Sequence, residues 1–212
     1  MNPFNRRQDH ALADFDARHA VVGSFSYAVP FRATSKALGA VANGWTLDGI
    51  ATLQSGMPFT ARLTSPVSRD GALSSAERPS LRPGASQNPT SGTSAGCAGF
   101  AAGTPVGTAN HWYDPCAFSV PLAGTYGNLG RNTIIGPGLA NVDLSLEKTF
   151  KLHEKTNATF RTEMFNVMNH ANFGLPATGA LAASGVANAS AGLITYTVTS
   201  SRQLQFAVRI TF

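Results

Sequence analysis

The chain has 212 residues, enough for one domain or a small pair of domains, and 13% of them are charged, about half the share in an ordinary soluble domain. Its 21 Gly and 12 Pro residues exclude a mainly helical chain and predict many turns or long loops. The formal net charge is +5, but the basic residues are scattered. We therefore expect no nucleic-acid partner, because such a partner requires a basic face that neutralises phosphates.

Residues 1–17 are expected to form an N-terminal loop segment. The first ten residues lack the apolar stretch of a signal peptide. If the protein is exported, we expect this chain to lack its natural beginning.

The first two predicted strands, residues 18–31 and 44–56, show a period of two, which places alternate side chains on opposite faces of a sheet. One face of each strand is apolar. Its larger members are Val21, Phe25 and Tyr27 in the first strand and Trp45, Leu47 and Leu53 in the second. A moderate turn, residues 32–43, is expected between them.

Residues 57–138 are expected to form a long irregular loop, because small and polar residues dominate them. Cys97 and Cys116 lie in this loop, and a disulfide between them would hold together a segment with little core of its own in an oxidising compartment. Two unpaired thiols are the alternative. Trp112, Tyr113 and Phe118 either bind a ligand at the cell surface or form a small core within the loop.

Two patterns in this loop raise the question of catalysis or metal binding. Residues 92–96 match the G-x-S-x-G pattern around Ser94, but that motif needs a strand before the serine and a helix after it, and residues 87–91 have loop composition. Cys97, His111 and Cys116 match no usual zinc spacing, and a structural zinc site needs four ligands. We therefore expect no enzymatic activity, no metal site and no cofactor.

Three more strands are predicted at residues 139–150, 157–168 and 201–212, with a long loop at residues 169–200. Residues 193–198 either extend the last strand or form a sixth. Charged residues recur on the polar faces of these strands, where they either line a lumen and touch a plug or substrate, or form a ladder of cross-strand ion pairs. They are Asp143, Glu147, Arg161, Glu163 and Arg209.

Short turns and long loops alternate along the chain, as they do in outer-membrane barrels with short periplasmic turns and long extracellular loops. This pattern predicts an all-β fold of antiparallel up-and-down strands whose apolar face meets lipid. A soluble β-sandwich with one dry face is the alternative. Aromatic residues near the strand ends fit an interfacial girdle. They are Tyr27, Phe31, Trp45, Phe150, Phe165 and Phe212.

Several stretches, taken in order, resemble the late barrel strands of TonB-dependent, Oar-like outer-membrane receptors. The most characteristic is Arg161–Gly174, RTEMFNVMNHANFG. The terminal strand resembles the family's ending, which the outer-membrane insertion machinery reads, through Phe206, Val208, Ile210 and Phe212. The other stretches are Asp14–His19, Gly44–Ile50, Leu53–Phe59, Tyr126–Asn132, Gly136–Gly138 and Asn141–Leu146.

The resemblance implies a transmembrane β-barrel of about 22 strands that encloses a plug and imports nutrients with energy relayed by TonB. Membrane barrels start at about 8 strands, so five or six strands cannot close and would leave two open edges. We therefore expect residues 18–212 to be a partial barrel, the C-terminal fragment of a receptor in the bacterial cell outer membrane, which does not transport alone. The implied partners are outer-membrane lipid, the barrel-assembly machinery, the missing plug and strands, and TonB through them. The alternative is a secreted, soluble β-rich binding or adhesion module that uses residues 57–138.

Overall fold

The computed structural model describes residues 6–71 and 77–212. Residues 1–5 of the expected N-terminal segment and residues 72–76 of the expected long loop lie outside the described residues. The chain forms two compact units. The sheet unit comprises residues 19–54, 139–172 and 197–212, and the loop unit comprises the described residues of 1–18, 55–138 and 173–196.

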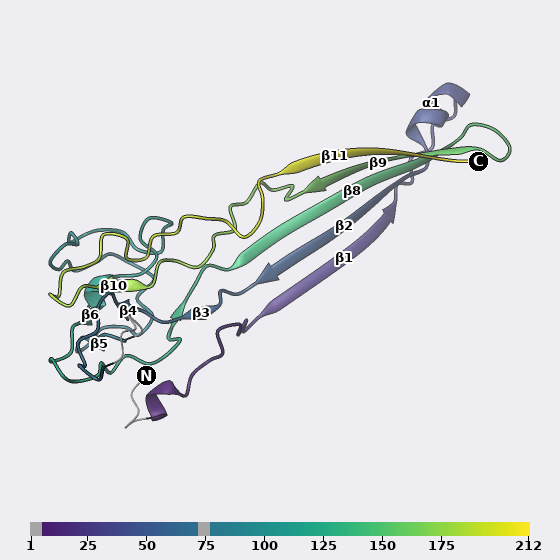
Figure 1. Cartoon of the computed structure of the whole chain (residues 1–212). Helices are drawn as coiled ribbons and strands as arrows, with labels where there is room; N and C mark the ends of the chain where they lie inside the picture. The colour runs from purple at the N-terminus through teal and green to yellow at the C-terminus, as the bar shows by residue number, and fades with distance from the viewer. Residues whose placement is uncertain (1–5, 72–76) are drawn as a thin grey trace. The chain divides into compact units, whose positions relative to one another are not determined.

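The sheet unit is built on five antiparallel strands in the order β1-β2-β8-β9-β11 (Figure 1). The strands are β1 (Ala20–Ala28), β2 (Trp45–Gln54), β8 (Leu139–Lys151), β9 (Asn157–Phe165) and β11 (Gln203–Thr211). The mainly β, antiparallel architecture expected from the alternation is therefore confirmed. Sheet closure is not seen, because β1 and β11 each pair with one strand among the described residues.

The register explains why a glycine, Gly49, lies among the large side chains of this sheet. Phe25 of β1 lies opposite Gly49 of β2. A Cβ at Gly49 would collide with the Phe25 ring and with Leu144. The missing side chain lets the aromatic ring lie across the neighbouring strand, a known way of covering a glycine in a sheet.

The connection between β1 and β2 contains a helix where only a turn was expected. Helix α1 (Lys36–Ala42) begins after Ser35, whose side chain accepts a hydrogen bond from the Leu38 N–H at 3.2 Å. Seven residues are too few for a helical period to stand out in the sequence. No helix in the described part of the chain is both long and apolar enough to cross a membrane.

The loop unit contains short strands joined by irregular segments. The strands are β3 (Pro58–Phe59), β4 (Arg62–Leu63), β5 (Ser80–Leu81), β6 (Phe118–Ser119), β7 (Ile134–Ile135) and β10 (Gly179–Leu181). The unit also contains the short 3-10 helices η1 (Arg6–Asp9) and η2 (Pro115–Ala117). The strands pair as β3 with β7, β5 with β6 and, in parallel, β4 with β10.

These segments share a hydrophobic core to which both expected long loops contribute. Its fully buried members include Leu63, Tyr113, Phe118, Ile134 and Leu181. The segments at 57–138 and 169–200 are therefore not independent loops, because apolar residues of both pack in one core. These residues show no periodic spacing in the sequence.

Residues 193–198 form no strand, so they neither extend the last strand nor form a sixth, and both expectations for them were wrong. The Ile194 N–H donates to the Ala109 carbonyl at 2.8 Å, and the Ile194 side chain is buried. Ile194 therefore packs within the loop unit, whereas Tyr196 and Val198 are more than half exposed.

Candidate membrane interface

All five strands contribute large apolar side chains to one face of the sheet, which we call the apolar face. Residues directly opposite in neighbouring strands point to the same face, so the register assigns every side chain. The large members of the apolar face are Val21, Phe25, Tyr27, Trp45, Leu47, Leu53, Val142, Leu144, Leu146, Phe150, Phe160, Met164, Leu204, Phe206, Val208 and Ile210.

The apolar face is most exposed along β11. Leu204, Phe206, Val208 and Ile210 leave 58–67% of their surface accessible, and Phe212 is fully exposed. The sequence motif expected to act in outer-membrane insertion therefore lies on an open face. A continuous apolar surface of this kind marks a membrane or partner interface.

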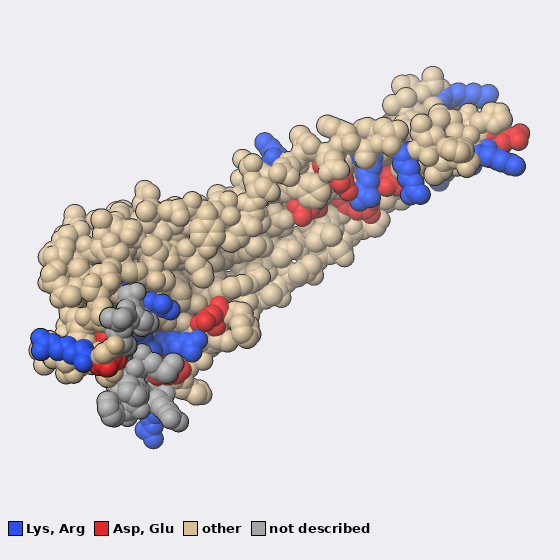
Figure 2. All heavy atoms as spheres, in the orientation of Figure 1, with Lys and Arg blue, Asp and Glu red and all other residues tan. Residues whose placement is uncertain are grey.

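The opposite face carries the polar side chains and is called the polar face. All five charged residues expected on a lumen wall lie on it, and Figure 2 shows acidic and basic side chains gathered over the sheet. The polar face comprises Thr46, Asp48, Ile50, Asn141, Asp143, Ser145, Glu147, Thr159, Arg161, Glu163, Phe165, Gln205 and Arg209 with the alternate residues of β1.

The charges of the polar face do not form the ladder of cross-strand ion pairs that was one of the two expectations. Arg161 pairs with Glu163 of its own strand at 2.9 Å, and its Nε donates across to the Ser145 hydroxyl at 3.1 Å. Glu147 lies opposite Arg161 in register, and Arg209 lies opposite Thr159. Arg161 and Glu163, with Asp48 of β2, line a pocket of about 190 Å³.

Asp143 supports the backbone at the point where β9 ends. Its Oδ1 accepts hydrogen bonds from the Asn166 N–H at 2.8 Å and from Asn141 Nδ2 at 2.9 Å. Asn166 has a left-handed φ of 47° and is buried. The carboxylate therefore stabilises a turn as well as contributing charge to the polar face.

This turn is formed by the stretch of sequence that carried the strongest family resemblance. The Asn166 side chain binds the carbonyls of His170 and Ser200, and Asn172, fully buried, accepts from the Ala140 N–H at 2.8 Å. His170 hydrogen bonds locally to Asn166 and Asn172, as expected of a residue at a strand end. The asparagines thus tie the end of β9 to the start of β8.

The aromatic residues expected in a girdle divide between the two faces. Tyr27, Trp45 and Phe150 lie on the apolar face at the end of the sheet that bears α1, and Phe31 follows β1 at that end (Figure 1). Phe165 was wrongly placed with them. It lies opposite Gln203 at the other end of the sheet, on the polar face, because its position in the alternation matches that of Arg161 and Glu163.

Lys148 interrupts the apolar face and is nevertheless buried. Its Nζ donates to the carbonyls of Val41 and Asn43, at 2.8 and 2.5 Å, at the C-terminal end of α1. The ammonium also lies 4.8 Å from the Phe150 ring centroid and 5.6 Å from that of Trp45. Helix carbonyls and aromatic faces both favour a cation, so the charge is satisfied within the sheet unit. Sequence reasoning missed this role.

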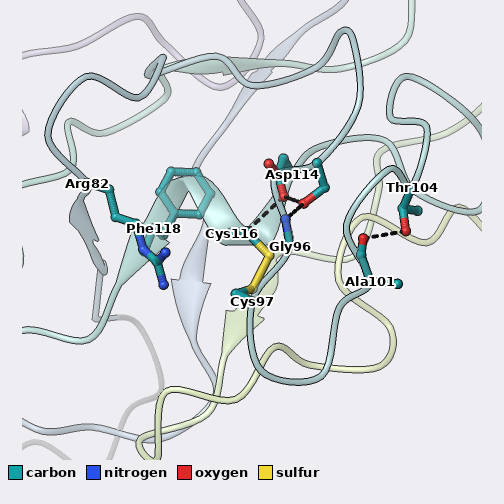
Figure 3. The surroundings of a disulfide bond; sticks show 9 residues. Arg82, Gly96, Cys97, Ala101, Thr104, Asp114, Cys116 and Phe118 are labelled. Carbon is teal, nitrogen blue, oxygen red and sulfur yellow. Dashed lines mark hydrogen bonds between the residues drawn. A yellow bond between two sulfur atoms is a disulfide. The ribbon is translucent and has the colours of Figure 1, made fainter.

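In the loop unit, Cys97 and Cys116 are joined in a disulfide, the pairing that the sequence left open (Figure 3). Asp114 accepts from the Cys116 N–H at 2.9 Å and from the Ser94 hydroxyl at 2.8 Å, and the Gly96 N–H donates to that hydroxyl. Ser94 is buried, and irregular chain rather than a helix follows it directly. Its hydroxyl stabilises the turn beside the disulfide. The sulfurs of Cys97 and Cys116, the two thiols considered as zinc ligands, are both in the disulfide.

The aromatic residues of the long loop serve its core. Tyr113 and Phe118 are fully buried, with ring centroids 6.2 Å apart, and Trp112 packs against this core while its Nε1 donates to the Ile135 carbonyl at 2.9 Å. Burial raises the pKa of Tyr113 far above its usual range. Of the two expectations for these residues, ligand binding at the cell surface or a small core within the loop, the structure fits the core.

A family model described as an outer membrane beta barrel domain matches residues 1–205 of the chain. The chain belongs to this family. Membership in the outer membrane beta barrel domain family places the protein in the bacterial outer membrane, so the expected localisation is confirmed. It also favours the membrane-spanning interpretation of the apolar face over a secreted, soluble module. No curated protein and no solved structure is significantly similar to the chain.

Proposed function

We propose that this chain forms the C-terminal part of the barrel wall of a TonB-dependent, Oar-like outer-membrane receptor that takes up a nutrient. The chain contributes no chemistry of its own. Its sheet unit supplies wall, and its loop unit supplies surface on the extracellular side. The remaining strands, the plug and, through the plug, TonB are its partners in this proposal, together with lipid and the barrel-assembly machinery.

The observation that carries the proposal is a two-faced sheet with two open edges. The apolar face of β11 is more than half exposed from Leu204 to Ile210, which suits hydrocarbon, where no hydrogen bonds are available. The polar face carries the charged residues Asp48, Arg161 and Glu163, which suits the polar interior of a barrel that holds a plug. Within residues 6–71 and 77–212, β1 and β11 each pair with one strand, and their open edges favour the presence of further strands.

The order of the resembling stretches supports the finer assignment to this receptor class. The Asn-rich stretch that resembles the receptors most closely makes the turn after β9, with both Asn166 and Asn169 in left-handed conformations. Asparagine tolerates this backbone better than most residues. The resemblance therefore coincides with residues that have a defined structural task.

Spin labels on β11 test which face meets lipid. Labels introduced at Phe206→Cys and Val208→Cys should be accessible to oxygen in the membrane, while labels at Gln205→Cys and Arg209→Cys should be accessible to a water-soluble relaxant or shielded by protein. Equal accessibility at all four positions would contradict the proposed orientation of the wall.

The size of the native polypeptide tests the receptor itself. An antiserum raised against this chain should detect, in outer-membrane fractions, a polypeptide far larger than the 22.1 kDa of the chain, because a plug and further strands precede it. The chain expressed alone serves as the size standard. A native product of the same size as that standard would contradict the receptor assignment while leaving the membrane orientation of β11 to the spin labels.

A further inference from the structure

A cavity of about 550 Å³ in the loop unit gathers three arginines. Arg62 belongs to β4, Arg78 precedes β5 and Arg131 precedes β7, so three separate segments bring positive charge to one place. Phe59, which is buried, forms an apolar part of the lining. An apolar pocket with a few convergent polar groups is the usual form of a small-molecule site.

The N-terminal segment of the same unit places two carboxylates in this cavity. Asp9 Oδ1 lies 2.6 Å from Arg78 Nη1, and both side chains are at most 15% exposed. Asp14 Oδ1 accepts from Asn132 Nδ2 at 2.6 Å and from Arg131 Nη2 at 3.2 Å. The cavity therefore already selects carboxylate groups, and its own chain provides them.

Asn132 is oriented for this contact by the rest of its surroundings. It is buried, its φ is 52°, and it exchanges two hydrogen bonds with Thr60, which accepts from the Asn132 N–H and donates to Asn132 Oδ1. Because Oδ1 is engaged by Thr60, the Nδ2 donors point to Asp14 and the Leu12 carbonyl. A donor fixed in advance loses little entropy when a ligand replaces its partner.

Asp14 is bound less firmly than Asp9, and the guanidinium of Arg62 pairs with neither of them. The Asp14 side chain is 73% exposed and that of Arg131 is 41% exposed, so their ion pair is weak and exchangeable. The hydrogen bond from Asn132, assisted by Arg131, lowers the pKa of Asp14, and Arg62 acts in the same direction through its charge. The Arg62 side chain itself makes no hydrogen bond or ion pair with any residue in the described ranges.

We propose that this cavity binds a small molecule carrying two or three carboxylate groups, which displaces Asp14 from Asn132 and Arg131 and also engages Arg62. Planar guanidinium groups match carboxylates in geometry as well as charge. Asp14 acts as an intramolecular competitor, because its tether keeps its effective concentration high. The inference does not rest on the proposed receptor function, since every lining residue lies within the loop unit.

Titration calorimetry of the full chain in detergent with citrate, at pH 7 and constant ionic strength, tests the site. Asp14→Ala should tighten citrate binding several-fold by removing the competitor, whereas Asp16→Ala, its matched control in the same segment, should leave it unchanged. Arg62→Gln and Arg131→Gln should weaken binding at least tenfold, and Arg202→Gln, outside the cavity, should not.

Arg62→Gln keeps the experiment decisive if another variant fails to fold, because this side chain has no partner to lose within the described residues. Undetectable citrate binding by the Asp14→Ala variant, or unchanged binding by Arg62→Gln, would overturn the proposal. Inorganic phosphate provides the second ligand. Binding of phosphate as tight as that of citrate would overturn the assignment to carboxylates, because the cavity would then respond to charge alone.

Discussion

Lys148 shows how a single charged residue is accommodated on an otherwise mainly apolar face of the sheet. A bare ammonium in hydrocarbon would be costly. Here the ammonium donates hydrogen bonds to two carbonyls at the end of α1, and the ring centroids of Trp45 and Phe150 lie within 6 Å of it. The residue that breaks the alternation of β8 therefore attaches the helix to the sheet.

Replacing this lysine should loosen α1. Lys148→Met removes hydrogen bonds from a charged donor, each of which contributes about 1.5–3 kcal/mol in folded proteins, so we expect a loss of stability of that order. Amide hydrogen exchange in residues 36–42 should become faster. Lys151→Met is the matched control, since Lys151 is exposed at the end of the same strand. Equal effects of both variants would show that the contacts with α1 contribute nothing.

A charge placed on either face of β11 should separate lipid from protein surroundings. Phe206 lies near the middle of β11, opposite Thr162. Phe206→Arg should cost about 2–4 kcal/mol in a bilayer if this site lies at the midplane. Gln205→Arg, on the polar face opposite Glu163, should change stability by less than about 0.5 kcal/mol. Urea unfolding in lipid vesicles measures both, and similar costs would argue against the membrane orientation.

Among the elements, the irregular segments of the loop unit depend on a cross-link as well as on their core. The disulfide joins cysteines separated by 19 positions. By the chain-entropy argument, closing a loop of this length stabilises the folded state by about 3 kcal/mol. Substituting both cysteines with alanine should therefore destabilise the loop unit by about this amount.

The two tryptophans make this prediction measurable, because Trp112 lies in the loop unit and Trp45 in the sheet unit. With Trp45→Phe in the background, fluorescence reports the loop unit, and the denaturation midpoint should fall when the disulfide is removed. With Trp112→Phe in the background, fluorescence reports the sheet unit, and its midpoint should stay where it is. Identical shifts in both backgrounds would show that the units unfold together.

The elements also show which parts of this fold a sequence reveals. Strands β1, β2, β8, β9 and β11 were predictable because each alternates for nine residues or more. The same alternation already grouped Phe165 with Arg161, and the error arose from weighing its aromatic character above its position. The core around Tyr113 and Phe118 was not predictable in the same way, because its members follow no period and come from distant segments.

The candidate sites divide in the same manner. The apolar face follows from local sequence, since every member lies in a strand with a clear period. The contact between Asp14 and Asn132 spans 118 positions, so no local pattern points to it. The contact of Lys148 with the C-terminal carbonyls of α1 could not be predicted either. It depends on the register of β2 with β8 and on a helix too short to be recognised in the sequence.

At the scale of the whole molecule, the two open edges of the sheet decide how the chain exists in a membrane. Among the described residues, β1 and β11 each have one neighbouring strand, while β8 lies between β2 and β9. In lipid every backbone N–H and C=O must be paired. The outward-facing groups of β1 and β11 therefore need partners in lipid, and in the proposed receptor further strands supply them.

Amide hydrogen exchange can detect those partners. In the chain expressed alone and folded in detergent, every amide of β8 from Leu144 to Lys148, where β2 and β9 both pair with it, should be protected. The amides of β1 and β11 should be protected only at alternate residues, because an edge strand directs every second N–H away from its neighbour. In the protein extracted from native outer membranes, the remaining amides of both edge strands should become protected as well. Full protection in both preparations would mean that the edges already meet partners when the chain is alone, and that no further strands are needed to complete the wall.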